Sequence, residues 1–256
     1  MPLRYTVLER LLLRDRIMAG AGLLLLTLLG WIYLAGVDYG PWFSLMAMPM
    51  RHAWRVGDVL LTLAMWAVMM VAMMTPSVAP VVLLTATVER RRGSHAPLSM
   101  AWLTLAGYFA VWTGASVLAT ALQWALHEAG LMANAMGGLR AWLAGILLVA
   151  VGLYQFAPVK ADCLRLCRSP VETLAQYWKP GSGGAIRLGL RHGLYCFGCC
   201  WALMLVLFVS GIMNLIWIAI LSVLVLAEKL LPRGLWLGRL AGAGLVAWGG
   251  RLIVGV

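Results

Sequence analysis

The sequence predicts an all-α protein: a polytopic transmembrane helix bundle of about seven helices. It would form a single integral membrane domain over residues 1–256, with its N-terminus in the cytoplasm. Hydrophobic residues make up 63% of the chain and charged residues only 11%, which is too few charges to cover a water-soluble fold. The apolar residues also gather into runs that reach the roughly 20 residues needed to cross a bilayer core.

Each apolar run is expected to be a helix, because backbone polar groups in lipid must bond within their own segment. The first run is too long for the apolar region of a cleavable signal peptide, so we expect it to remain as a helix. Arginines before the first run and between the second and third lie on one predicted side, which the positive-inside rule makes cytoplasmic. The runs cover 17–37, 58–86, 98–124, 139–157, 190–210, 212–231 and 234–254.

The net charge of +11 comes from 20 lysines and arginines against 9 acidic residues. These basic residues lie in short loops between apolar runs, where no basic soluble domain is available to bind nucleic acid. Basic loops beside membrane helices are typical of topology signals and of contacts with anionic lipid headgroups. The lipid bilayer is therefore the expected partner and nucleic acid is not. Glycine-rich helices would permit an oligomer, which the sequence leaves open.

Three of the five cysteines lie within five residues. Residues at i, i+3 and i+4 share a helix face, so Cys196, Cys199 and Cys200 are expected to point the same way. His192 would lie one turn before them and Met204 one turn after. Soft sulfur ligands beside an imidazole suit Cu(I), Zn(II) or an iron–sulfur centre. The alternatives are cysteines that only pack a crowded helix interface and a His192 that contacts lipid headgroups.

The other two cysteines, Cys163 and Cys167, are four residues apart and would also share a helical face. The predicted topology brings them to the same cytoplasmic membrane surface as the start of the run at 190–210. Four cysteines at bonding distance would make a Cys₄ or Cys₃His metal set. Thiols in the cytoplasm stay reduced, which favours metal or redox chemistry over structural disulfides.

Methionines supply a second group of soft donors. Met70, Met73 and Met74 lie in the run at 58–86, where their thioethers either line a path for a soft metal or pack against a neighbouring helix. The segment Met46–Met50 lies in the first outside loop. It either holds Cu(I) or dips into the membrane surface, and the sequence does not decide between these.

An acidic and a basic residue are neighbours near the inner end of the run at 212–231. Charged groups within a membrane helix are costly, so they pair or reach the surface. We expect Lys229 to extend to the membrane surface and to neutralise Glu228, which is a structural role.

Several strings of residues carry a family resemblance. The most specific runs from Gly193 to Met204 and contains Cys-x-x-Cys-Cys-Trp. The others are Met73 to Ser77; Tyr154-Gln155 with Pro158, Lys160, Cys163 and Cys167; Gly211 to Trp217; and Glu228-Lys229. Together they resemble a bacterial family of predicted metal-binding integral membrane proteins, which carries a domain-of-unknown-function label. The resemblance implies metal binding through cysteines and methionines in a bacterial inner (plasma) membrane, and it includes neither the first outside loop nor the last helix.

The sequence therefore predicts an integral membrane protein that binds a soft metal ion. Copper is the preferred ion, with zinc and iron as alternatives. The protein would handle or transfer the metal, with a metallochaperone or metalloenzyme as partner. Cys196-x-x-Cys199 also has the spacing of a redox dithiol, so a membrane thiol-disulfide oxidoreductase is an alternative. A subunit of a metal-dependent membrane enzyme and a purely structural scaffold are two others. No catalytic residue is indicated, and an enzyme is not the favoured interpretation.

Overall fold

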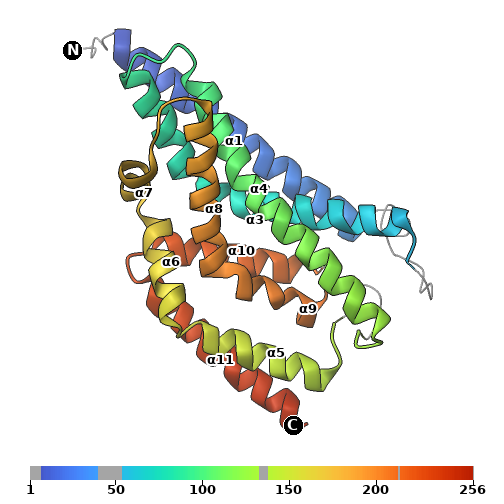
Figure 1. Cartoon of the computed structure of the whole chain (residues 1–256). Helices are drawn as coiled ribbons and strands as arrows, with labels where there is room; N and C mark the ends of the chain where they lie inside the picture. The colour runs from blue at the N-terminus through green and yellow to red at the C-terminus, as the bar shows by residue number, and fades with distance from the viewer. Residues whose placement is uncertain (1–6, 40–53, 133–137, 213, 256) are drawn as a thin grey trace.

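The computed structural model describes residues 7–39, 54–132, 138–212 and 214–255, and these residues form ten helices and no strand longer than one isolated bridge. The all-helical class is thus confirmed for the described residues. In chain order (Figure 1) the helices are α1 (Val7–Tyr39), α3 (Val56–Arg91), α4 (Pro97–Glu128), α5 (Ala141–Tyr154), α6 (Pro158–Arg168), α7 (Pro170–Tyr177), α8 (Ser182–Leu205), α9 (Leu207–Ser210), α10 (Leu215–Leu230) and α11 (Gly234–Val254).

Five segments in the described part are long and apolar enough to cross a membrane: α1, α3, α4, α8 with α9, and α11. Helices α5 and α6 make a sixth candidate only when taken together, since they are bent by 62° at their junction. Helix α10 has 16 residues, fewer than the roughly 20 that a bilayer core requires. Every predicted apolar run coincides with a helix, but seven spanning helices remain a prediction.

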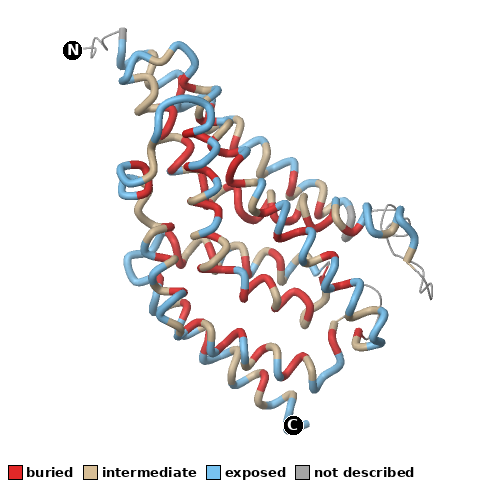
Figure 2. Tube along the Cα trace, in the orientation of Figure 1, coloured by how far each residue is buried: buried red, intermediate tan, exposed pale blue. Residues whose placement is uncertain are grey.

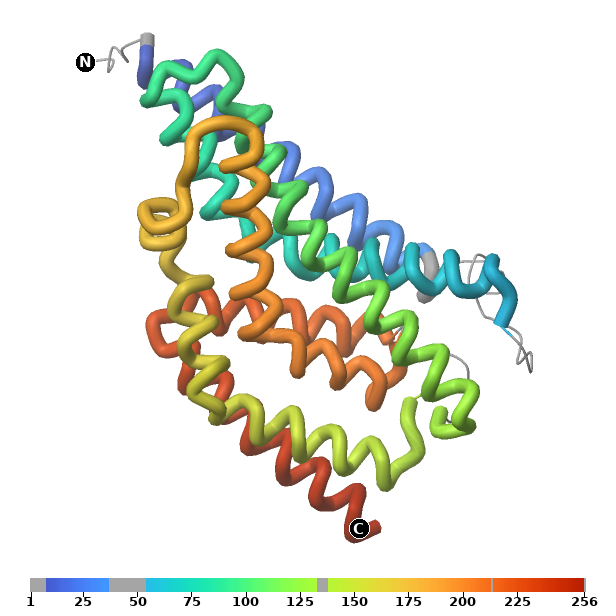
Figure 3. Tube along the Cα trace, in the orientation of Figure 1, coloured from blue at the N-terminus to red at the C-terminus, as the bar shows by residue number. Residues whose placement is uncertain are grey.

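The helices are arranged in three groups (Figures 1 and 3). Helices α1, α3 and α4 pack against one another in chain order, and α5 pairs with α11 on the opposite side of the molecule. Helices α8, α9 and α10 lie between these groups, with α6 against α8 and α10 against α11. Segments that are far apart in the sequence therefore meet around α8.

Helices α4 and α8 lie side by side and run in the same direction. Gly189 packs against the Thr104 carbonyl, and one turn later Gly193 packs against Val111 and the Tyr108 carbonyl. A Cβ at Gly193 would stand 2.9 Å from the nearest Val111 methyl, so the contact requires a residue without a side chain. Small residues at such positions let membrane helices approach closely.

The chain bends sharply between α5 and α6. Pro158 is the first residue of α6, where its missing N–H costs nothing and its fixed φ suits a new helix. This bend, which the predicted single run at 139–157 did not include, turns α6 back onto α8. A second break follows α9, where Gly211 has a φ of +95° that favours glycine. This break lies between the predicted runs at 190–210 and 212–231.

The buried residues follow the inner faces of the helices (Figure 2). Helix α3 is continuous through Pro76 and Pro80, and it buries five methionines among the described residues. These are Met65, Met69, Met70, Met73 and Met74. Tyr108 and Trp112 of α4 and the cysteines of α8 complete the same core. Leucines and isoleucines on the outer faces of α1 and α11 are exposed, as expected for surfaces that contact hydrocarbon.

Candidate metal centre

Helix α8 buries its three cysteines at the centre of the protein. Cys196, Cys199 and Cys200 are each at most 1% exposed. The Sγ atoms of Cys199 and Cys200 both lie 3.0 Å from the Cys196 carbonyl oxygen, to which the thiols donate. The spacing i, i+3, i+4 thus places all three on one side of α8, and the glycine contacts with α4 hold that helix in position.

Helix α6 adds a fourth thiol to this group. The Cys167 side chain is 6% exposed and lies in the same buried cluster as the Cys196 and Cys199 thiols, with which it interacts. Cys163 is half-buried and lies against Gly198, where a Cβ would stand 2.7 Å from the Cys163 sulfur. All five cysteines are free thiols. The two cysteine-bearing segments therefore meet, with Cys167 at the inner thiols and Cys163 nearer the surface.

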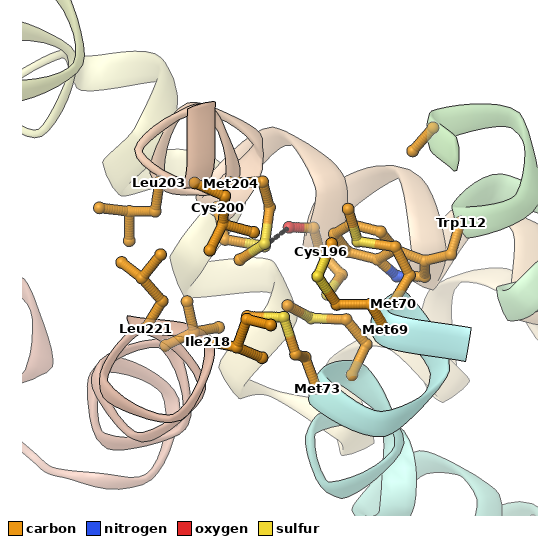
Figure 4. Packing of buried hydrophobic residues seen from close by; sticks show 14 of the residues in the cluster. Met69, Met70, Met73, Trp112, Cys196, Cys200, Leu203, Met204, Ile218 and Leu221 are labelled. Atoms are coloured by element: carbon orange, nitrogen blue, oxygen red, sulfur yellow. Dashed lines mark hydrogen bonds between the residues drawn. The ribbon is translucent and has the colours of Figure 1, made fainter. Parts of the chain in front are cut away.

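Thioethers surround the thiols. Figure 4 shows the side chains of Met70 and Met73 on α3 directed toward Cys196 and Cys200, with Met204 beside them on α8. These three methionines are buried in the same core cluster as the cysteines, as is Met74. The predicted sulfur donors of α3, α6 and α8 thus belong to one continuous buried region.

Two polar groups that the sequence interpretation did not assign to this region contact Cys196. The Lys229 Nζ donates to the Cys196 Sγ at 2.9 Å, and the Tyr108 hydroxyl oxygen lies 2.9 Å from the same sulfur. Lys229 is 8% exposed and Tyr108 is fully buried. The signal that could have found Lys229 was a lysine inside an otherwise apolar helix.

The expected pairing of Lys229 with Glu228 is wrong. Consecutive residues point to different sides of a helix, and here Lys229 turns toward α8 while Glu228 turns toward α6. The Glu228 carboxylate instead accepts from Lys160 Nζ at 2.7 Å, and Lys160 also donates to the Gln155 side chain. Both charged side chains of this pair are 1% exposed.

His192 is buried under Tyr108, with their ring centroids 5.8 Å apart. The imidazole is 1% exposed, so the expected contact with lipid headgroups is wrong. Neither ring nitrogen has a hydrogen-bond partner among the described residues. His192 lies one turn before Cys196 on the same helix face, so the buried imidazole is close to the thiols.

An apolar cavity of about 400 Å³ adjoins the sulfur region. It lies between α3, α4 and the α8–α9 segment, and Met70 and Met204 line it together with aromatic rings. Trp66 forms one wall, where its Nε1 donates to Gln123 at 2.8 Å and its ring stacks on Phe208. Solvent water would find few polar partners in this cavity.

The donors near Cys196 suit a soft, low-coordinate ion. Within the described ranges, no three His, Cys, Asp or Glu side chains are arranged to hold a metal ion together. What meets at Cys196 is a set of thiols with thioethers around it, and such soft ligands select Cu(I), Zn(II) or iron–sulfur clusters over harder ions. The Met46–Met50 segment lies outside the described residues.

Comparison with known proteins finds a matching protein family. A family model described as "PpoB2: Copper chaperone" matches residues 63–252, which is most of the chain and includes every cysteine. No curated protein matches the chain, and no solved structure does.

Proposed function

Because the chain belongs to the PpoB2 copper chaperone family, we propose that it carries copper as Cu(I) on sulfur ligands inside a bacterial inner membrane and passes it to a metalloenzyme partner. Two thiolates at a time would hold the ion, drawn from four inner thiols: Cys196, Cys199 and Cys200 of α8 and Cys167 of α6. The supporting ligands are Cys163, Met70, Met73, Met74, Met204 and His192. Copper is the cargo in this proposal, and no catalytic residue is assigned.

One observation carries the proposal: thiols from two distant segments meet in a buried region that is already lined with thioethers. Thiolates and thioethers are soft ligands, which favour Cu(I) over Mg²⁺, Ca²⁺ or Mn²⁺. Burial also keeps water and oxidants away from a bound Cu(I) ion. The oxidoreductase alternative gains no support from the family match.

Solvent exposure decreases from Cys163 to Cys167 to Cys196, and this suggests the order in which the thiols would bind the ion. Cys163 is half-buried, Cys167 is 6% exposed, and Cys196 is fully buried. Cys163 is placed to receive the ion, since it is the thiol that a partner can reach. Transfer then proceeds by exchange of sulfur ligands to Cys167 and Cys196, each thiol releasing its proton as it binds.

Membrane integration is supported by five candidate spans and by the many large apolar side chains that remain exposed on α1 and α11. Contiguous apolar surfaces of this kind are covered by a partner or by lipid. The basic residues at the end of α3 and just after it, including Arg91 and Arg92, would then lie with the N-terminus on the cytoplasmic side.

Metal analysis of the purified protein tests the proposal. Full-length protein is extracted in detergent with its thiols reduced, loaded with Cu(I) and analysed by mass spectrometry. We expect about one copper per chain, and loss of most of it in Cys196→Ser and in Cys167→Ser, because each substitution removes a soft ligand. Less than about a tenth of an equivalent in the reduced wild type would contradict a copper site.

A matched control comes from the outer thiol. Cys163→Ser changes the same atom on the same helix as Cys167→Ser. If Cys163 receives the ion, this variant keeps its copper at equilibrium but acquires it more slowly from a Cu(I)-chelator complex. Equal equilibrium losses in Cys163→Ser and Cys167→Ser would instead place both thiols around the bound ion.

A further inference from the structure

We infer that Lys229 makes the Cys196 site selective for a monovalent ion, because its ammonium group supplies a fixed positive charge at the sulfur. The inference rests on the proposed function, since it concerns the ion that the same site would take. Its starting observation is the 2.9 Å contact between Lys229 Nζ and Cys196 Sγ. Both groups are buried, so the charge on each strongly affects the other.

No ion pair of Lys229 with a carboxylate is found among the described residues, although its charge also acts on the neighbouring Glu228. The adjacent carboxylate of Glu228 is paired with Lys160 on α6, at 2.7 Å. The largest charge interactions of Lys229 are with the thiols of Cys167, Cys196 and Cys199 and the hydroxyl of Tyr108. The ammonium group therefore faces a set of sulfurs and one phenol, each of which is neutral when it carries its proton.

Charge balance then distinguishes between ions. A monovalent ion on two thiolates forms an anionic complex, and one ammonium group beside it brings the net charge of the site to zero. A divalent ion on the same two thiolates is already neutral, so the ammonium group leaves an uncompensated positive charge. Uncompensated charge in a buried site is strongly unfavourable.

A third thiolate would restore neutrality for a divalent ion, but the geometry does not favour it. No three ligands of the types that Zn(II) takes converge in the part of the chain that the structure describes. The neighbouring methionines are neutral, and thioethers are ligands for Cu(I) more than for Zn(II). The position of Lys229 and the neighbouring thioethers thus both favour a monovalent soft ion.

The test compares affinities for a monovalent and a divalent probe. Ag(I), a redox-inert monovalent soft ion, and Zn(II) are titrated into reduced full-length protein against chelators of known affinity. In Lys229→Gln, we expect Ag(I) affinity to fall at least about tenfold and Zn(II) affinity to rise or stay the same. Lys229→Arg retains the charge, so its ratio of affinities should stay near that of the wild type.

A double variant controls for the loss of a buried lysine. Lys160→Met with Glu228→Gln removes the other lysine together with its partner, which leaves no unpaired charge and does not touch the thiols. Its affinity ratio should match the wild type. Circular dichroism and thermal unfolding of the metal-free variants check the fold, and Lys229→Met serves in place of the Gln variant if the latter does not fold.

The possible outcomes distinguish a failure of the proposed function from a failure of the role of Lys229. A wild type that binds neither Ag(I) nor Cu(I) contradicts the proposed function, and the inference with it. A wild type that binds Ag(I), beside a folded Lys229→Gln or Lys229→Met variant with an unchanged affinity ratio, overturns the role of Lys229 alone. A ratio that shifts equally in the double control variant would also overturn it.

Discussion

Lys160 on α6 and Glu228 on α10 form an ion pair in the protein interior, with Nζ and Oε1 2.7 Å apart. Each side chain is 1% exposed, and Lys160 also donates to the Gln155 side chain at the end of α5. A Cβ at Gly238 on α11 would stand 3.0 Å from Lys160 Nζ. One buried pair therefore joins the helices that surround the bend after α5.

Removing one partner of this pair should lower the free energy of unfolding far more than removing both partners. Lys160→Met is expected to lower the free energy of unfolding by roughly 3–5 kcal/mol, because it leaves a buried carboxylate without its ion-pair partner. Adding Glu228→Gln should recover most of that loss. Chemical unfolding in detergent, followed by tryptophan fluorescence, measures both. Additive losses in the double variant would show that the two groups do not interact.

Gly189 should not tolerate a side chain. Gly189→Ala would force a methyl group into the Thr104 carbonyl on α4, so we expect a loss of about 1–3 kcal/mol in unfolding free energy. Gly114→Ala is the matched control, since nothing lies within 4 Å of the added Cβ on α4. The control should be neutral or slightly stabilising, because alanine favours a helix. Equal effects of the two substitutions would contradict the close α4–α8 contact.

His192 should not be needed for folding of the metal-free protein, but it should be needed for full affinity for Cu(I). Its ring nitrogens are buried without a partner among the described residues, so His192→Phe is expected to stabilise the metal-free protein by about 1 kcal/mol. The same variant should bind Cu(I) more weakly if the imidazole is a ligand. Thermal unfolding with and without copper measures both effects. A less stable metal-free variant would indicate that the imidazole does have a partner.

The hydrogen bond from Trp66 to Gln123 should contribute measurably to stability. Gln123→Leu keeps the volume and removes the acceptor, and we expect a cost of roughly 1 kcal/mol, as for other polar contacts between membrane helices. Trp66→Phe removes the donor, and the double variant completes a cycle that isolates the pair. A coupling energy near zero would mean that the bond does not hold α3 to α4.

The helices were predictable because hydrophobic runs and helical period are local properties. Each predicted apolar run coincides with a helix, and Cys196, Cys199 and Cys200 share a face because 3.6 residues make one turn. The end of α5 was also readable in principle, since Pro158 fits the first position of a helix. The predicted run at 139–157 ends at this junction, but composition alone does not show that the chain bends there by 62°.

The charged partners of the site were not predictable in the same way. Whether Lys229 faces Glu228, the membrane surface or Cys196 depends on how α10 is rotated against α6 and α8, and that rotation is set by packing between distant segments. His192 was misplaced for the same reason, because Tyr108 of α4 covers it. The ligand roles of the cysteines and methionines remain a prediction.

The parallel contact between α4 and α8 has a consequence for synthesis. Helices α1, α3 and α4 follow one another closely in sequence, so they can associate while later segments are still being made. The α4–α8 interface closes a much longer loop, and Lys229 follows later still. We therefore expect Cys196 to lack its Lys229 contact on the nascent chain until α10 has been inserted, so that the site is completed only late in synthesis.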